Sequence, residues 1–334
     1  MGKTDLRFSG NGIHILLIGY SRIARKRIID ALNASGQVAR LDIASKTSAD
    51  VARVEQKIPG QVFDSYDGAL EKSHAEFVYI SLPNSMHAVW AEKALQNGRH
   101  VIVDKPACTS YDDAHRLSEL AKAKKLLLAE ANVFPCHPQI ERVSDEFRNA
   151  ATLPTRITAT FSFPPLRQDD FRYQPRYGGG AFNDLGPYAI SAGTVFFNEY
   201  PARIFCRING RAETGVETAF TVAAFYSRGR SMVGHFGFDT EYQNSITILG
   251  PSLCIRFDRV FTISPDCANT LYIRRNDQTA EAVIPPADPF LNFFSRIFAA
   301  CRNRQFDDLH NHLLLQAKSL DMLKQSAKKE ETYD

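Results

Sequence analysis

The stretch that decides the fold runs from residue 13 to residue 24 and reads Ile-His-Ile-Leu-Leu-Ile-Gly-Tyr-Ser-Arg-Ile-Ala. Its first six residues are mostly apolar, which predicts a buried strand over Ile13–Ile18. A glycine follows at once, and a helical pattern over Ile23–Leu32 comes next. A strand, a tight turn and a helix in this order direct backbone N–H groups and the positive helix end toward a pyrophosphate. The stretch therefore predicts a dinucleotide-binding turn, and a strand-to-helix turn without a ligand is the alternative.

This turn departs at one position from the pattern G-x-G-x-x-G/A of dinucleotide-binding proteins. Gly19 and Ala24 fit the pattern, whereas Ser21 replaces the middle glycine. Serine is small, so a phosphate can still approach closely, and the hydroxyl can bond a phosphate oxygen. We expect the residues of the turn to bind the cofactor, namely Gly19, Tyr20, Ser21, Arg22 and Ile23.

Outward from this turn, short apolar runs alternate with helical patterns up to about residue 130. Further strands are predicted at 39–44, 77–82, 100–103 and 126–129, and further helices at 87–96 and 111–124. Strands of this kind, alternating with helices, form a parallel sheet that is covered on both faces. Residues 1–130 are therefore predicted to form an α/β domain, a doubly wound Rossmann fold that binds a dinucleotide.

After residue 130 the pattern changes to strands joined by short turns that contain Gly, Asn or Asp. Strands are predicted at 156–163, 202–209, 219–227, 231–238, 245–249, 253–258 and 270–275, and helices at 137–151, 180–196, 289–303 and 308–324. Such short connections are typical of antiparallel pairing. Residues 131–334 are predicted to form an α+β domain with a large, mostly antiparallel sheet, for substrate binding and oligomerisation. Its last helix can pack back on the first domain.

The composition excludes several classes of protein. Of the 334 residues, 44% are hydrophobic and 23% are charged, which is ordinary for a globular chain. Lys and Arg number 40 against 37 Asp and Glu, so no basic excess indicates a nucleic-acid or membrane partner. Six scattered cysteines without CxxC spacing fit a reducing compartment and no metal site. No apolar run is long enough for a signal peptide or membrane helix, so we expect a cytoplasmic protein.

The end of the second predicted strand bears on the choice of cofactor. An acid there would bind the ribose 2′-hydroxyl of NAD. Instead the tip reads Ser45-Lys46-Thr47, whose hydroxyls and cation suit a 2′-phosphate. Asp42 is the competing candidate, but it lies three residues back inside the strand. We therefore expect NADP(H) to be preferred, with NAD(H) as the alternative.

Three further motifs follow in order. They are Ser-Leu-Pro-Asn-Ser-Met-His at 81–87, His-Val-Ile-Val-Asp-Lys-Pro at 100–106, and Gly-Gly-Gly-Ala-Phe-Asn-Asp-Leu-Gly-Pro-Tyr at 178–188. With the turn they resemble the glucose–fructose oxidoreductase / inositol dehydrogenase / MocA family over nearly the whole chain. The resemblance implies an NAD(P)-dependent oxidoreductase that acts on a sugar alcohol or carbonyl group. It implies cofactor contacts at Leu82, Pro83, Asn84, His87, Asp104 and Lys105.

Lys105 is the first of three expected catalytic residues. The family's Glu-Lys-Pro stands here as Asp104-Lys105-Pro106, and its lysine meets the reacting oxygen of the substrate. A lysine at the carboxyl end of a parallel strand also points into the crevice where such folds bind ligands. Its ammonium can polarise a carbonyl and stabilise a developing alkoxide.

Asp184 and Tyr188 are the other two expected catalytic residues. Their spacing of four residues places them on one face of a helix. An ordinary tyrosine has a pKa of about 10, and a nearby Lys105 ammonium would lower that pKa. We expect Tyr188 to donate the proton, with Asp184 orienting it or binding a substrate hydroxyl; a packing role for Tyr188 is the alternative. Pro187, directly before Tyr188, is expected to disturb the helix and to kink it.

Within the family, the stretch Glu130–Gln139 is similar to the nucleotide-sugar 3-ketoreductases of deoxysugar pathways. So are 171–173, 241–244 and 258–262. This similarity implies substrate contacts at His137, Arg172 and Tyr173, together with Asp184 and Tyr188. A structural role at the start of a helix is the alternative for His137.

The preferred function is NADPH-dependent reduction of a keto group on a nucleotide-linked deoxysugar. A dehydrogenase of a free sugar, cyclitol or diol is the first alternative, and a non-catalytic NADP-binding protein is the second. We expect no metal, no nucleic acid and no membrane partner. A homodimer or homotetramer through the sheet of the second domain is expected from the resemblance.

Overall fold

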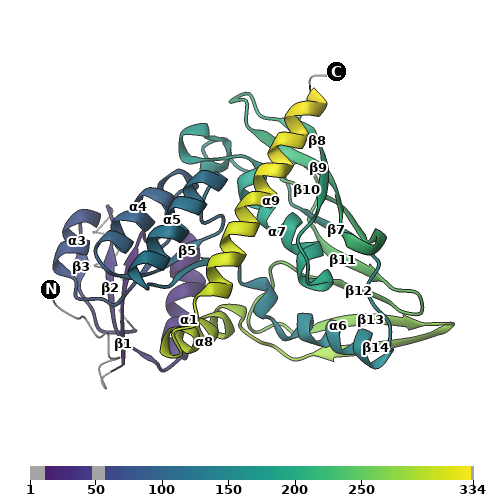
Figure 1. The fold of residues 1–334 in the computed structure, drawn as a ribbon, viewed down its shortest axis with the longest axis horizontal. Coiled ribbons are helices and arrows are strands. Elements are labelled where there is room, and N and C mark those ends of the chain that lie inside the picture. Colours follow the sequence, from purple (N-terminus) through teal and green to yellow (C-terminus); the bar gives the residue numbers. More distant parts are fainter. Residues whose placement is uncertain (1–11, 47–56, 332–334) are drawn as a thin grey trace. The chain divides into compact units, whose positions relative to one another are not determined.

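The computed structural model describes residues 12–46 and 57–331. The chain divides into two compact units. Among these residues, the first unit consists of 12–46, 57–107, 114–131 and 290–313, and the second of 108–113, 132–289 and 314–331. Figure 1 shows the first sheet in purple and blue and the second in teal and green.

The first unit contains a six-stranded sheet in the order β3-β2-β1-β4-β5-β6. Every neighbouring pair is parallel. The strands are β1 (Ile13–Ile18), β2 (Val38–Ala44), β3 (Val62–Phe63), β4 (Phe77–Ile80), β5 (His100–Asp104) and β6 (Leu128–Ala131). The chain order reverses between β1 and β4, and ligands of such folds bind at the carboxyl ends of the strands beside this reversal. The predicted doubly wound fold is confirmed.

Helices cover this sheet. A π-helical turn (Ala24–Ile28) continues into α1 (Ile29–Ala34), followed by α3 (Tyr66–Lys72), α4 (Asn84–Gln96) and α5 (Tyr111–Lys124). Helix α8 (Pro289–Arg302) also packs on the sheet, where the Phe298 ring lies 5.6 Å from that of Phe77. Large apolar side chains thus seal the face beside β4.

The second unit contains an eight-stranded sheet in the order β14-β13-β12-β11-β7-β10-β9-β8. Among the described strands of this sheet, β7 and β10 form the one parallel pair, and the other pairs are antiparallel. The strands are β7 (Arg156–Ser162), β8 (Arg203–Arg211), β9 (Glu217–Phe225), β10 (Ser231–Gly237), β11 (Gln243–Leu249), β12 (Cys254–Asp258), β13 (Asn269–Arg275) and β14 (Gln278–Ile284). The predicted mostly antiparallel sheet is confirmed.

One face of this sheet carries helices α6 (Pro138–Asn149), α7 (Ala181–Phe197) and α9 (Asp307–Glu331) (Figure 1). Helix α7 is apolar on nearly all sides because it lies between the sheet and α9, where a Cβ on Gly186 would meet Leu320 at 2.5 Å. Short 3-10 turns at 134–136, 171–173, 175–177 and 227–229 complete the unit.

Some sequence predictions were wrong in detail. Strands β3 and β14 and helix α3 were not predicted, β6 begins two residues later than expected, and α9 continues to Glu331. Helix α7 also continues through Pro187, whose carbonyl oxygen accepts from the side chain of Gln316 at 2.8 Å. Within the described residues, no helix is long and apolar enough to cross a membrane.

Candidate functional site

Gly19 follows β1 where the chain turns toward the first helix. Its φ is +95°, which side chains disfavour, and an added Cβ would overlap the carbonyl oxygen of Ser81. Its amide donates to the carbonyl oxygen of Ala44 at 2.9 Å. The backbone therefore passes closely between the ends of β2 and β4. The residues of the turn, Tyr20 to Ile23, remain half-buried or exposed, so they can meet a ligand.

Ser21, the substitution in the glycine pattern, belongs to a chain of hydroxyl groups. Its Oγ accepts from the amide of Ala24 at 3.1 Å and lies 2.7 Å from the Oγ of Ser81. Ser81 donates to Oδ2 of Asp104 at 2.6 Å, so the Ser21 hydroxyl is the donor to Ser81. Tyr79 donates to Oδ1 of Asp104 at 2.6 Å. Asp104 thus joins the ends of β1, β4 and β5, and burial raises its pKa.

Asp42, the competing ligand for a ribose hydroxyl, is fully buried inside β2. Its carboxylate accepts from the amide of Gln61 at 2.8 Å, the hydroxyl of Ser73 at 2.7 Å and Nε of Arg40 at 3.0 Å, and Nε2 of His14 lies 2.9 Å away. Burial alone would raise the pKa of Asp42, but these hydrogen bonds bring that pKa below its ordinary value. With these partners, the Asp42 carboxylate has a structural role in the sheet.

The tip of β2 is formed by Ser45 and Lys46, while Thr47 lies outside the described residues. Ser45 is buried, and its amide donates to the carbonyl oxygen of Phe63 at 2.9 Å. Lys46 is exposed, with its ammonium 5.7 Å from the centre of the Tyr66 ring. The described part of the tip therefore presents a cation.

His87 was expected to contact the cofactor, and the structure places it in α4 with 1% of its surface exposed. Its ring nitrogens lie 2.8 Å from the carbonyl oxygen of Pro106 and 2.7 Å from that of Leu82. Burial lowers the pKa of His87. This side chain joins the loop after β4 to the turn after β5. In that loop Leu82 and Pro83 are half-buried, and Asn84 is buried at the start of α4.

Lys105, directly after β5, is half-buried. Two residues further, the amide of Ala107 donates to Oε2 of Glu130 at 2.8 Å. Glu130 lies in β6, is 7% exposed, and its Oε1 has no hydrogen-bond partner among the described residues. Burial raises the pKa of Glu130 to about 7, although the Ala107 amide and the Lys105 charge oppose this shift. The sequence analysis assigned no role to Glu130. The feature that could have indicated one is that Glu130 is an acid in an otherwise apolar strand.

In the second unit, Asp184 lies in the first turn of α7 and is 8% exposed. Its Oδ2 accepts from Nε of Arg172 at 2.6 Å, and Arg172 also donates to Asp170 at 3.3 Å. The guanidinium carbon lies 4.6 Å from the centre of the Phe171 ring. Any Cβ on Gly179 would overlap the carbonyl oxygen of Arg172, so this glycine permits the close approach. The expected substrate residues Arg172 and Asp184 are thus brought together as an ion pair.

Tyr188 lies one turn after Asp184 on the continuous helix, as the spacing predicted. The centre of its ring is 5.2 Å from that of Phe161, 5.5 Å from Phe261 and 6.1 Å from Phe134. Three aromatic rings thus hold the tyrosine ring in one orientation.

The loop that carries Phe261 is itself held by buried amides. Oδ1 of Asn244 accepts from the amide of Phe261 at 3.0 Å. Gln139 donates to the carbonyl oxygen of Val260 at 3.0 Å and accepts from Asn269 at 2.7 Å. Sequence reasoning assigned no role to these amides, although Gln139 and Asn244 lie in motifs that it noted.

His137 begins α6 and is 1% exposed, as its structural alternative predicted. Its Nδ1 accepts from the amide of Gln139 at 3.3 Å, so the neutral ring carries its proton on Nε2. This Nε2 is buried and has no hydrogen-bond partner among the described residues. Tyr173 accepts from the amide of Leu166 at 3.0 Å, and its ring lies 5.4 Å from that of Phe238, so its contacts are structural.

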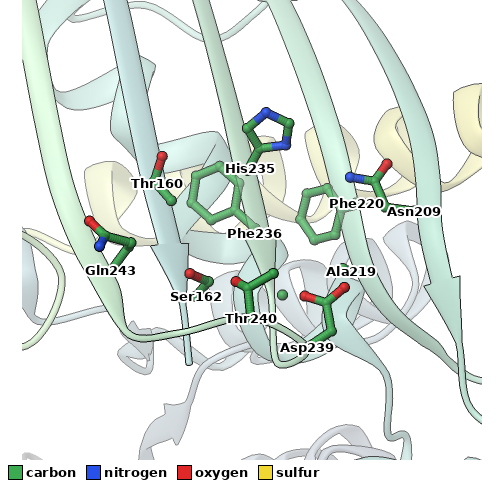
Figure 2. Close-up of a pocket in the computed structure, with 11 residues that line it drawn as sticks. Thr160, Ser162, Asn209, Ala219, Phe220, His235, Phe236, Asp239, Thr240 and Gln243 are labelled. Atoms are coloured by element: carbon green, nitrogen blue, oxygen red, sulfur yellow. The ribbon is translucent and has the colours of Figure 1, made fainter. Parts of the chain in front are cut away.

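A hollow of about 260 Å³ lies at the second sheet and is lined, among others, by Thr160, Ser162, His235 and Gln243. Figure 2 shows the residues that line it. Alternation along β7 directs Thr160 and Ser162 away from Phe161, which packs with Tyr188. None of the expected site residues lines this hollow. Across residues 12–46 and 57–331, no group of three His, Cys, Asp or Glu side chains is arranged for a metal ion.

Comparison with known proteins identifies the family. Residues 13–131 match the model of an oxidoreductase family with an NAD-binding Rossmann fold, GFO/IDH/MocA, and residues 153–255 match a C-terminal domain of that family. A dTDP-3,4-didehydro-2,6-dideoxy-alpha-D-glucose 3-reductase from Actinomadura kijaniata is 30% identical over 283 residues, covering 84% of this chain and 85% of that protein. A D-xylose 1-dehydrogenase (NADP(+)) from Haloferax volcanii is 28% identical, covering 82% and 84%.

Among solved structures, the chain is similar to KijD10, a 3-ketoreductase from Actinomadura kijaniata, in complex with NADP and TDP-benzene. The TM-score is 0.89 at 28% identity, covering 95% of this chain and 98% of that chain. The two family models, the sequence identity over most of the chain and the two observed sheets all agree. The chain therefore belongs to the GFO/IDH/MocA family of oxidoreductases.

Proposed function

We propose that this oxidoreductase uses NADPH to reduce a keto group on a nucleotide-linked deoxysugar. The observation that supports it most is the similarity over 95% of the chain to a 3-ketoreductase crystallised with NADP and TDP-benzene. The first unit offers the features that a dinucleotide requires: a glycine turn without room for a Cβ, a helix start directly after it, and a lysine at the end of β5.

The proposed preference for NADPH rests on the tip of β2. Lys46 is exposed there, and the nearby acid Asp42 is buried with four partners. A 2′-phosphate would gain from the ammonium of the exposed Lys46. A ribose 2′-hydroxyl would find no acceptor carboxylate at Ser45 or Lys46.

The bound cofactor would supply the hydride to the carbonyl carbon. In the proposed reaction Tyr188 donates its phenolic proton to the carbonyl oxygen, and the Lys105 ammonium stabilises the negative charge that develops on that oxygen. Packing of the Tyr188 ring against three phenylalanines fixes its direction before substrate arrives, which is what proton transfer requires. Asp184 holds Arg172 in place through the 2.6 Å bond.

Substrate recognition is assigned to Arg172 and His137. The guanidinium of Arg172 suits a diphosphate, and its carbon lies 4.6 Å from the centre of the Phe171 ring. The buried Nε2–H of His137 can donate to a sugar hydroxyl. Tyr173 would act by shaping the segment, since its hydroxyl is used by Leu166.

The test is a titration of the protein with NADPH and NADH, followed by nicotinamide fluorescence, with and without TDP and UDP. NADPH should bind more tightly, Lys46→Ala should remove most of that preference, and TDP should bind independently of the cofactor. Lys72→Ala, an exposed lysine of α3, is the matched control. Equal affinities for NADPH and NADH would refute the assigned phosphate site, and no cofactor binding would refute the proposal as a whole.

A dehydrogenase of a free sugar remains the second candidate, and the 28% identity to a D-xylose 1-dehydrogenase favours it. It predicts NADPH binding without a nucleotide site and turnover of free sugars. A non-catalytic NADP-binding protein would bind NADPH and turn over neither class.

We also propose that the open face of the second sheet joins two copies of the chain. Alternation leaves large apolar side chains on that face, with Phe205 46% and Val233 45% exposed. Such side chains on a sheet face typically mark an interface. Sedimentation at several concentrations should show a dimer or tetramer that Val233→Glu dissociates, and a monomer in the unaltered protein would contradict this.

A further inference from the structure

Glu130 is a buried acid that the proposed reaction does not use. We propose that Glu130 is a positioning residue, whose ionised form holds the turn that carries Lys105. The proposal rests on the proposed function, because it takes Lys105 as the group that stabilises the substrate oxygen. It adds a proton-dependent control to that site.

The backbone geometry places Glu130 beside this turn. In the parallel pairing of β5 with β6, Glu130 is opposite Val103, two residues before Lys105. Its Oε2 receives the amide of Ala107, two residues after Lys105. The same turn is held at Pro106 by the ring of His87. Glu130 and His87 therefore both form hydrogen bonds with the backbone of this turn.

The charged groups around Glu130 affect whether its carboxyl group is ionised. Lys105 is the cation that acts on it, and Asp104 and His87 are the other titratable groups at the turn. Both oxygens of Asp104 already accept hydroxyl donors, and His87 is bonded to two carbonyl oxygens. Glu130 differs, since its Oε1 is buried without a hydrogen-bond partner among the described residues.

An unpaired buried oxygen makes the carboxylate costly, while the amide and the lysine stabilise it. These opposing effects bring the pKa of Glu130 to about 7, so both forms are populated near neutral pH. The carboxylate is the stronger acceptor for the Ala107 amide, because hydrogen bonds to a charged group are stronger.

The experiment compares the unaltered enzyme with Glu130→Gln, which keeps an acceptor for Ala107 and cannot ionise. The turnover number kcat of the unaltered enzyme should fall about tenfold as the pH drops from 8 to 6, whereas that of Glu130→Gln should stay low throughout. A constant ratio of the two kcat values at every pH would overturn the proposal, since a purely structural role predicts it. Glu119→Gln, the same change on the exposed face of α5, is the control and should follow the unaltered profile.

A second measurement needs no substrate. In protein labelled with carbon-13 at the glutamate carboxyls, the Glu130 signal is the one missing from Glu130→Gln. It should titrate near pH 7, and Lys105→Met should raise its midpoint. Titration below pH 5, or a midpoint unaffected by Lys105→Met, would overturn the proposal. If no nucleotide sugar is reduced, the proposed function fails, while this titration still decides whether Glu130 is coupled to Lys105. Should Glu130→Gln not fold, Glu130→Asp identifies the signal instead and should retain an ionisation in the kcat profile.

Discussion

Replacing Glu130 by glutamine should change how the stability of the first unit depends on pH. The pKa of this carboxyl is about 7 in the folded chain, against an ordinary value of 4.5. Between these values the folded state keeps a proton that the unfolded chain has lost, so the free energy of unfolding falls as the pH rises. The loss is complete above pH 7.

The magnitude follows from the two pKa values. A shift from 4.5 to about 7 corresponds to about 3 kcal/mol in all, of which about 2.5 kcal/mol is lost between pH 5 and pH 8. Glutamine has no ionisable proton, so this pH-dependent part of the free energy of unfolding is absent in Glu130→Gln. The buried amide that replaces Oε1 carries its own cost of about 1–3 kcal/mol, which does not depend on pH.

Urea unfolding at pH 5 and pH 8, followed by the fluorescence of Trp90, measures this difference. Trp90 is the single tryptophan of the chain, lies in α4 of the same unit and is 7% exposed, so it reports the unfolding of that unit. Relative to the unaltered protein, Glu130→Gln should gain about 2.5 kcal/mol on going from pH 5 to pH 8. An equal difference at the two pH values would refute the reasoning, and Glu119→Gln should show that equal difference.

Three substitutions test other parts of the site. Tyr188→Phe should lower kcat about 10²- to 10⁴-fold in steady-state assays and leave the NADPH Kd unchanged, because it removes the proton and keeps the packed ring. An unaltered kcat would contradict its role as proton donor. Gly19→Ala should abolish NADPH binding by fluorescence titration and lower the Tm, since its Cβ overlaps the Ser81 carbonyl oxygen; normal binding would contradict the turn assignment. Arg172→Lys should raise the KM for a TDP-linked sugar about tenfold with kcat little changed, because lysine lacks the planar fork; an unchanged KM would place the diphosphate elsewhere.

Local sequence patterns were sufficient for most of the fold. The apolar run Ile13–Ile18 and the helical pattern 111–124 coincide with β1 and α5, because continuous burial and helical spacing are both visible in the residues. Strand β14 was missed because five of its seven residues, including the first four, are exposed. Strand β3 has two residues and exists through its pairing with Ile43 and Ala44 of β2. Neither strand could be recognised from its own composition.

The candidate site also has residues that local sequence patterns predict and contacts that they do not predict. Gly19 and Lys105 could be selected because turns and strand ends are local features, and Asp184 and Tyr188 because their motif resembles that of the family. The pairing of Asp184 with Arg172 could not, since the two are brought together by the backbone around Gly179. The positions of His87 and Glu130 under the Lys105 turn also depend on strands that are distant in sequence, so only the folded chain reveals their contacts.

The proposed reaction transfers a hydride from NADPH to the keto group of a nucleotide-linked sugar. The most direct measurement uses NADPH that carries deuterium at C4 of the nicotinamide, with dTDP-3,4-didehydro-2,6-dideoxy-alpha-D-glucose as the probe and free D-xylose with NADP as the comparison. The sugar product should gain one deuterium, detected by mass spectrometry, and D-xylose should not be oxidised. An unlabelled nucleotide sugar together with turnover of D-xylose would contradict it.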